Sequence, residues 1–92
     1  MPALDEKQVT DGLAKLPGWS RAGNAITKTF SFKNYYETMA FVNAVAWIAH
    51  RQDHHPDLEV GYNKCRVRYS THSAGGLTDM DFAGARAVED LL

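Results

Sequence analysis

The chain has 92 residues, of which 45% are hydrophobic and 23% are charged, and its formal net charge at pH 7 is -1. This length allows one domain with a modest core, and the composition is that of a globular chain and excludes a disordered one. The near-neutral balance, with both signs interspersed, argues against a surface that binds nucleic acid by neutralising phosphates. We therefore expect residues 1–92 to form a single domain without direct nucleic-acid contacts.

Cysteine use and hydropathy predict a cytoplasmic protein that does not enter a membrane. The single cysteine, Cys65, excludes an internal disulfide framework and fits a reducing compartment. We see no basic-then-apolar leader segment. The longest mainly apolar stretch, about residues 39–49, is too short to span a bilayer.

The first third of the chain predicts a helix followed by a β-hairpin. Asp5 and Gln8 are spaced as a capping box, and apolar residues then recur at helical spacing until Pro17. A strand that begins near Trp19 returns, after a glycine-containing turn, over residues 25–32. Apolar and hydroxyl side chains alternate along this return strand, so we expect the hairpin to bury one face.

A long helix is predicted from about Asn34 to Arg51. It is apolar around most of its circumference, which is too much for one side of a 92-residue monomer. We expect one side to pack on the sheet and the other to meet a second subunit, and we expect Trp47 to belong to the core. The apolar stripes are Tyr35, Met39, Val42, Ala46 and Ala49, and Phe41, Val45 and Ile48.

Two more strands and a last helix complete the pattern. Apolar and polar side chains alternate over residues 57–62 and again over residues 64–70, which is typical of antiparallel strands with one buried face. A helix then begins at Thr78, with Asp81 at the capping-box position. The expected buried side chains are Leu58, Val60, Tyr62, Cys65, Val67 and Tyr69 in the strands, and Phe82, Ala85, Val88 and Leu92 in the helix.

The predicted order is helix, strand, strand, helix, strand, strand, helix. This order indicates an α+β fold in which three helices cover one face of a four-stranded antiparallel sheet.

All four histidines lie between positions 50 and 72, and His54 and His55 are adjacent. Histidine gains and loses a proton near neutral pH, so a cluster of histidines suits acid–base chemistry. His72 follows a predicted strand and precedes Gly75-Gly76. One hypothesis is a pocket built from these two segments, and the alternative is that the histidines are unrelated surface residues. The number of histidines alone does not decide between these two hypotheses.

The spacing of these residues argues against a metal site. Adjacent side chains usually project in different directions, so chelation of one ion by both His54 and His55 is awkward. Strand parity places Cys65 on the predicted core face, which argues against it both as a ligand beside His72 and as a nucleophile. We therefore expect no metal.

An ordered set of segments closely resembles the signature of the pterin-4a-carbinolamine dehydratases, and it covers nearly the whole chain. The segments are Gly18-Trp19, Asp53-His54-His55-Pro56, Tyr62-Asn63, Thr71-His72 and Gly75-Gly76-Leu77-Thr78, followed by Asp81. The resemblance implies three helices on one face of a four-stranded antiparallel sheet, a homodimer or homotetramer, and no metal or organic cofactor. It also implies a hydro-lyase that converts 4a-hydroxytetrahydrobiopterin to quinonoid dihydrobiopterin and so recycles the cofactor of aromatic amino acid hydroxylases.

The resemblance also implies catalytic residues. Loss of water needs a proton delivered to the hydroxyl on C4a and a proton taken from N5, and imidazoles can do both near neutral pH. His55 and His72 would be the main acid–base pair, and His54 would contact the pterin or act on it. Which histidine is the acid stays open.

Further residues would bind the pterin. Asp53 would orient a histidine, Trp19 would offer an apolar wall to the flat ring, and the backbone from Thr71 to Ser73 would meet the pterin edge. For Asp81, a helix cap and a substrate contact remain equally open.

Two positions depart from the family pattern. His50 stands where many relatives have a carboxylate, and Leu58 stands where an aromatic residue is common.

Two other functions remain open. The first alternative is a non-catalytic relative that acts in protein binding, assembly or transcriptional co-regulation, as animal members do with a homeodomain factor. The second alternative is a dehydratase for another pterin.

Overall fold

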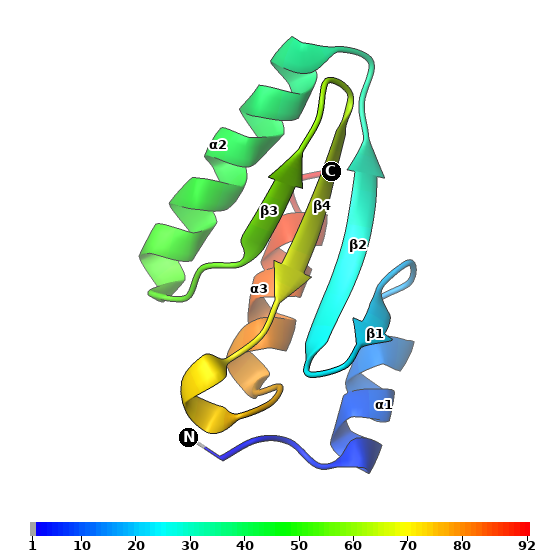
Figure 1. Ribbon diagram of the computed structural model, residues 1–92, viewed down its shortest axis with the longest axis vertical. Coiled ribbons are helices and arrows are strands. Elements are labelled where there is room, and N and C mark those ends of the chain that lie inside the picture. The colour runs from blue at the N-terminus through cyan, green and yellow to red at the C-terminus, as the bar shows by residue number, and fades with distance from the viewer. Residues whose placement is uncertain (1) are drawn as a thin grey trace.

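The computed structural model describes residues 2–92, and they form the predicted α+β fold (Figure 1). The strand order is β1-β2-β4-β3, with every neighbouring pair antiparallel, so β1 and β3 are the sheet edges. The elements are α1 (Glu6–Ala14), β1 (Ser20–Ala22), β2 (Ala25–Ser31), α2 (Tyr35–Gln52), β3 (Asp57–Val60), β4 (Lys64–Tyr69), the short 3-10 helix η1 (His72–Ala74) and α3 (Asp79–Glu89).

The helix starts follow the signals in the sequence. The Asp5 carboxylate accepts the Gln8 backbone N–H at 2.8 Å, and the Gln8 side chain accepts the Asp5 backbone N–H at 2.9 Å. Asn34 caps α2 by accepting the Glu37 backbone N–H at 3.0 Å. The predicted capping box at the start of α3 is also present. Each cap satisfies backbone donors that a helix start leaves unpaired.

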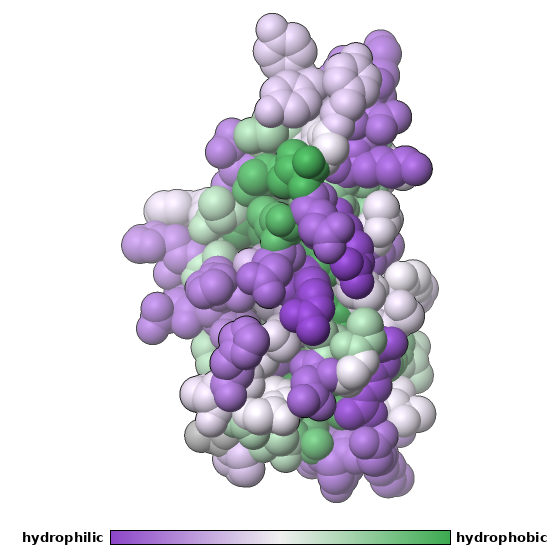
Figure 2. Space-filling model, viewed as in Figure 1, coloured by the Kyte–Doolittle hydropathy of each residue, from purple (hydrophilic) through white to green (hydrophobic). Residues whose placement is uncertain are grey.

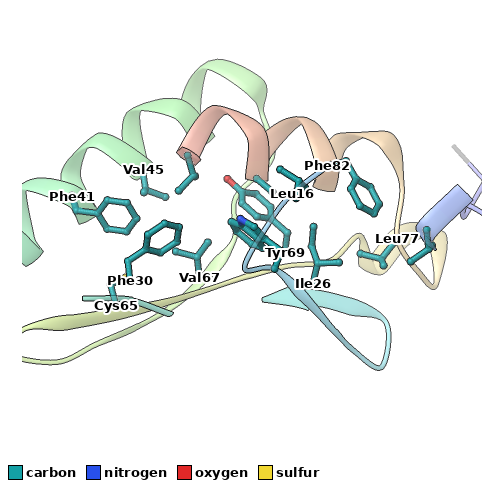
Figure 3. Close-up of a cluster of buried hydrophobic side chains, with 14 residues drawn as sticks. Leu16, Ile26, Phe30, Phe41, Val45, Cys65, Val67, Tyr69, Leu77 and Phe82 are labelled. Carbon is teal, nitrogen blue, oxygen red and sulfur yellow. The ribbon is translucent and has the colours of Figure 1, made fainter. Parts of the chain in front are cut away.

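The core lies between the sheet and the helices (Figure 3). It includes Ile26 and Phe30 from β2, Cys65, Val67 and Tyr69 from β4, Phe41 and Val45 from α2, and Phe82 and Val88 from α3. Burial raises the pKa of the Cys65 thiol, as expected for a core cysteine. The other face of the sheet carries mostly hydrophilic side chains (Figure 2). Among residues 2–92, no helix has the length and apolar character needed to cross a membrane.

Four expectations about burial were wrong. Trp47 is 61% exposed on the outer side of α2 and does not belong to the core. Leu92 is 70% exposed because α3 ends at Glu89 and does not carry it against the sheet. Val60 and Tyr62 are exposed because β3 is a short edge strand that ends at Val60. Strict alternation identified the strand but could not show that it lies at the edge.

Candidate active site

Residues from two distant segments enclose one cavity of about 270 Å³. It lies where the end of α2 and the start of β3 meet the end of β4 and η1. Antiparallel pairing places Asp57 of β3 opposite Arg68 of β4, so the segments that flank this pair come together. The lining residues are Asp53, His54, His55, Asp57, Arg68, Ser70, Thr71, His72 and Ser73. The three predicted catalytic histidines therefore share this cavity.

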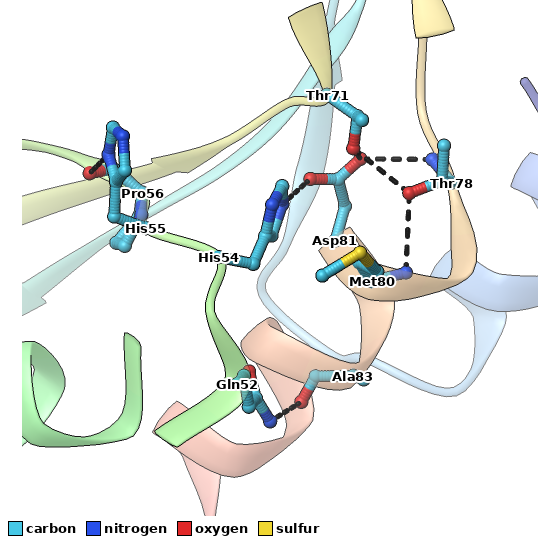
Figure 4. A network of polar contacts seen from close by, with 9 residues as sticks. All are labelled: Gln52, His54, His55, Pro56, Thr71, Thr78, Met80, Asp81 and Ala83. Atoms are coloured by element: carbon cyan, nitrogen blue, oxygen red, sulfur yellow. Dashed lines mark hydrogen bonds and ion pairs between the residues drawn. The ribbon is translucent and has the colours of Figure 1, made fainter. Parts of the chain in front are cut away.

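The end of α2 determines how the two adjacent histidines point. Asp53 adopts a left-handed conformation with φ of 51°, and its N–H bonds back to carbonyl oxygens of the last helical turn. Aspartate tolerates this conformation better than most residues. The chain then leaves the helix, and the His54 ring points toward α3 while the His55 ring lies on another side (Figure 4). The expected divergence of the two side chains is confirmed.

A buried carboxylate holds the His54 ring. Nε2 of His54 lies 2.6 Å from Oδ1 of Asp81, whose side chain is 0% exposed and sits in the first turn of α3. Oδ2 of Asp81 accepts the Thr78 backbone N–H at 2.9 Å and the Thr71 hydroxyl at 2.8 Å (Figure 4). Because the carboxylate is an acceptor, it favours the tautomer with the proton on Nε2 and leaves Nδ1 able to accept a proton.

The loop that carries His72 is fixed at both of its ends. Thr71 pairs with Gly76 as an isolated β-bridge, and the hydroxyl oxygens of Thr71 and Thr78 lie 2.9 Å apart. Between these contacts the chain forms η1 and then turns at Gly75, whose φ of 70° favours glycine. The sequence predicted only a diglycine turn here and missed η1. The exposed His72 therefore directly follows a residue that is held by the Gly76 bridge and by Thr78.

Tyr69 forms the wall behind His54, a contact that sequence reasoning missed. The two rings stack with centroids 5.8 Å apart and planes 20° apart. Burial, and then the negative charge of Asp81, raise the pKa of Tyr69 to about 12, so its phenol stays neutral near pH 7. A Cβ at Gly84 would lie 2.5 Å from the Tyr69 ring. Only glycine at that position therefore lets the ring pack between α3 and His54. Strand alternation marked Tyr69 only as a core residue.

The structure separates the remaining predicted site residues. Asp53, Thr71 and Ser73 line the cavity, but Trp19 lies outside it. The Trp19 ring is buried in the core, 6.1 Å from the Phe30 ring, and its indole N–H donates to Glu89. An apolar wall formed by Trp19 is thus not part of this cavity.

Asp81, and not Asp53, is the acidic residue that contacts a histidine. Asp81 is buried and contacts His54, so it holds a histidine and does not face the cavity as a substrate-binding residue. Of the two roles that the sequence left open for Asp81, the structure shows the helix cap, and the contact with His54 comes in addition to it. Asp53 had been expected to orient a histidine, and it is instead an exposed residue at the end of α2.

His50 takes no part in the cavity. Its ring stacks on exposed Trp47, with centroids 5.7 Å apart, on the outer side of α2. The departure from the family pattern at position 50 therefore does not change the residues that line the histidine cavity. Across residues 2–92, no three His, Cys, Asp or Glu side chains are grouped so that they could hold a metal ion. The donors and acceptors at the cavity are suited to moving protons.

Comparisons with known proteins identify the family of the chain. The model of one family, described as pterin 4 alpha carbinolamine dehydratase, matches residues 2–91. A protein of Nitrosospira multiformis, provisionally named pterin-4-alpha-carbinolamine dehydratase, is 57% identical over 91 residues, which are 99% of this chain and 80% of that protein. A similarly named protein of Stenotrophomonas maltophilia is 57% identical over 90 residues, covering 96% of this chain and 78% of its own.

Two solved structures are also similar. One, described as a transcriptional coactivator/pterin dehydratase from Brucella melitensis, superposes with a TM-score of 0.93 at 33% identity and covers 97% of each chain. The other, a pterin dehydratase-like protein described as a RuBisCO assembly factor in the α-carboxysome, has a TM-score of 0.66 at 23% identity. It covers 79% of this chain and 84% of its own, and it shows a shared fold alone.

Proposed function

Because this chain belongs to the pterin 4 alpha carbinolamine dehydratase family, we propose that it removes water from 4a-hydroxytetrahydrobiopterin and gives quinonoid dihydrobiopterin. The observation that carries this proposal is the shared cavity of His54, His55 and His72. The product would return to the cofactor cycle of an aromatic amino acid hydroxylase.

The reaction balances with proton transfers alone. The C4a–O bond breaks, and the hydroxyl leaves as water after it receives a proton. N5 loses its proton, and its electron pair forms the C4a=N5 double bond. No oxidant or reductant is consumed, so the protein must supply only a proton donor, a proton acceptor and a site that orients the ring.

The surroundings of each histidine support a division of labour. His54 is the proposed acceptor of the N5 proton, because Asp81 would stabilise the imidazolium that forms. His55 and His72 are exposed to solvent, and we propose them as the pair that protonates the leaving hydroxyl and exchanges protons with water. Ser73 and Thr71 would bind the pterin edge from the same loop.

A protein-binding role is the second candidate. It is favoured by the exposed aromatic side chains of α2, Trp47 and Tyr36, which lie outside the histidine cavity. The Brucella melitensis relative is described as a coactivator as well as a dehydratase. Because the two roles would use different residues, variants of the cavity separate them.

Stopped-flow kinetics with chemically generated 4a-hydroxytetrahydropterin tests the enzymatic proposal. We expect the wild-type protein to accelerate dehydration, and His55→Ala or His72→Ala to lower the rate by at least about tenfold, since a positioned acid or base contributes roughly 10²–10⁴-fold. Both side chains are exposed, so the melting temperature should stay nearly unchanged.

His50→Ala is the matched control, because it removes an exposed imidazole that does not line the cavity. It should keep wild-type activity. A wild-type protein without acceleration would exclude the dehydratase, and equal rates in all the variants would exclude the histidine mechanism.

A further inference from the structure

A second hollow of about 240 Å³ adjoins the histidine cavity. It is lined by Asn24, Arg68, Ser70, Thr71, His72, Gly75 and Gly76. Four of these residues, Arg68, Ser70, Thr71 and His72, also line the first cavity. The two hollows therefore adjoin along the side chains at the end of β4, which is the arrangement that a ligand longer than a bicyclic ring would need.

The second hollow is suited to a negatively charged group. Its lining contains a guanidinium, an imidazole, an amide and hydroxyls, with no Asp or Glu among these residues. It also contains two glycines, where the backbone can approach a ligand closely.

Arg68 has hydrogen-bonding capacity to spare. Its ion-pair partner is Asp57, at 3.7 Å, and the Asp57 side chain is 64% exposed. The neighbouring Arg66 is engaged more closely, since it contacts Glu59 at 2.6 Å and donates to the Thr27 hydroxyl at 3.1 Å. A guanidinium has five N–H donors in a planar fork that fits phosphate and carboxylate groups.

The chemistry of a pterin connects the two hollows. C6, which carries the variable substituent, is bonded to N5, and N5 is bonded to the reacting carbon C4a. A histidine that acts at C4a or N5 therefore stands next to the point where the substituent leaves the ring. His72 lines both hollows, so a ring bound in the histidine cavity would direct its substituent past His72 into the second hollow.

We propose that the second hollow binds the C6 substituent of the pterin and that Arg68 makes the site prefer a substituent ending in an acidic group. Phosphate and carboxylate share the recognising chemistry, and either would bind better than the uncharged dihydroxypropyl chain of a biopterin. This inference rests on the proposed function, because it assumes a pterin ring among the histidines.

Matched ligands test the preference. 7,8-Dihydroneopterin and its monophosphate differ only in the phosphate, and 6-hydroxymethylpterin and 6-carboxypterin form a second pair that presents a carboxylate. Dissociation constants are measured by pterin fluorescence at low salt. The wild-type protein is expected to bind the acidic member of at least one pair about fivefold more tightly, with the advantage shrinking as salt is added.

Three variants assign the preference to a residue. Arg68→Gln should abolish the advantage of the acidic ligand, whereas Arg66→Gln should keep it, because Arg66 lines neither hollow. Arg68→Lys, which retains the charge without the fork, should keep part of it.

Equal affinities within both pairs for the wild-type protein would overturn the inference, as would an advantage that survives in Arg68→Gln. If neither member of any pair binds, the proposed function itself fails. If both members bind equally, only the preference for an acidic substituent fails.

Discussion

The buried carboxylate of Asp81 makes His54 part of the folded structure as well as of the cavity. A buried charge is costly unless it is paired, and Asp81 has three donors from His54, Thr78 and Thr71. Removing the His54 ring would leave the buried Oδ1 of Asp81 without a donor, and a buried acceptor left unsatisfied typically costs about 1–3 kcal/mol. Loss of activity in His54→Ala would thus mix unfolding with chemistry, whereas His55 and His72 can be replaced without this effect.

Tyr69 gives the stability of the protein a dependence on alkaline pH. Its pKa is raised from 10.0 to about 12, so the folded protein holds the phenol proton more tightly than the unfolded chain does. The resulting stabilisation is fully present below pH 10 and is lost as the pH rises through the folded pKa. Between these limits, wild-type protein should lose roughly 2–3 kcal/mol of unfolding free energy that Tyr69→Phe does not lose.

Urea unfolding at a series of alkaline pH values measures this difference. Tyr62→Phe is the control, because the Tyr62 ring is exposed, and this variant should follow the wild-type curve. Near pH 7, Tyr69→Phe should not be destabilised, since the Tyr69 hydroxyl has no hydrogen-bond partner within residues 2–92. Parallel curves for wild type and Tyr69→Phe would show that the buried phenol does not titrate in this way.

At single positions, the sequence predicted local contacts better than distant ones. The capping box of Asp81 follows from a spacing of three residues and was predicted correctly. Its contact with His54 joins residues 27 positions apart and depends on how α2 ends beside α3. No local sequence pattern predicts the contact between Asp81 and His54. The stacking of the Tyr69 ring on His54 could not be predicted from a local pattern either.

Close packing of α3 against β4 places the Tyr69 ring beside His54. Adding a Cβ at Gly84 forces the Tyr69 ring to move, and the face of that ring supports His54. We expect Gly84→Ala to destabilise the fold by about 1–3 kcal/mol, as overpacking usually does, and to lower the dehydration rate of the protein that remains folded.

Gly12→Ala provides the comparison. Its Cβ would lie 2.6 Å from the Phe82 ring, where α1 meets α3, so its overlap is similar but does not involve the Tyr69 ring. Thermal melts and stopped-flow rates on folded protein should show comparable destabilisation in both variants and a lower rate only in Gly84→Ala. An undiminished rate in Gly84→Ala would mean that Tyr69 does not position His54.

The elements themselves were largely predictable. Period-two alternation and helix caps identified every strand and α-helix in the correct order over the part of the chain that the structure describes. The errors concern what covers each element. The burial of Val60 was predicted wrongly because alternation does not show which strand lies at the edge of the sheet. The helix η1 was missed because three residues are too few to show a helical period.

The outer side of α2 leaves large aromatic side chains in water. Trp47 and Tyr36 are both mostly exposed, and exposed aromatic clusters often mark an interface. We therefore keep the prediction that the protein forms a homodimer or homotetramer, which would cover this side of the helix. Light scattering on the purified protein should give a multiple of the 10.2 kDa chain mass.

A charged residue introduced on the outer side of α2 tests whether this surface forms the contact between subunits. Trp47→Glu should lower the measured mass, while Lys15→Glu, at the exposed end of α1, should not. A wild-type mass of about 10 kDa would contradict the assembly, and an unchanged mass in Trp47→Glu would show that α2 is not the contact.

For the molecule as a whole, the prediction of the fold class and the prediction of the histidine cavity rested on different kinds of evidence. The fold followed from periodicity, which is a local physical signal. The convergence of His72 with His54 and His55 was a hypothesis from their number and became specific only through the family resemblance. The pairing of β3 with β4 now gives its physical cause, because Asp57 opposite Arg68 brings the flanking segments together.

NMR of the histidine rings during titration with 7,8-dihydrobiopterin, a stable analogue of the product, tests most directly whether one pterin contacts all three histidines. The ring nitrogens of His54, His55 and His72 should shift together with one dissociation constant, while those of His50 should stay in place. Shifts confined to a single cavity histidine, or shifts with unrelated dissociation constants, would contradict a shared pterin site.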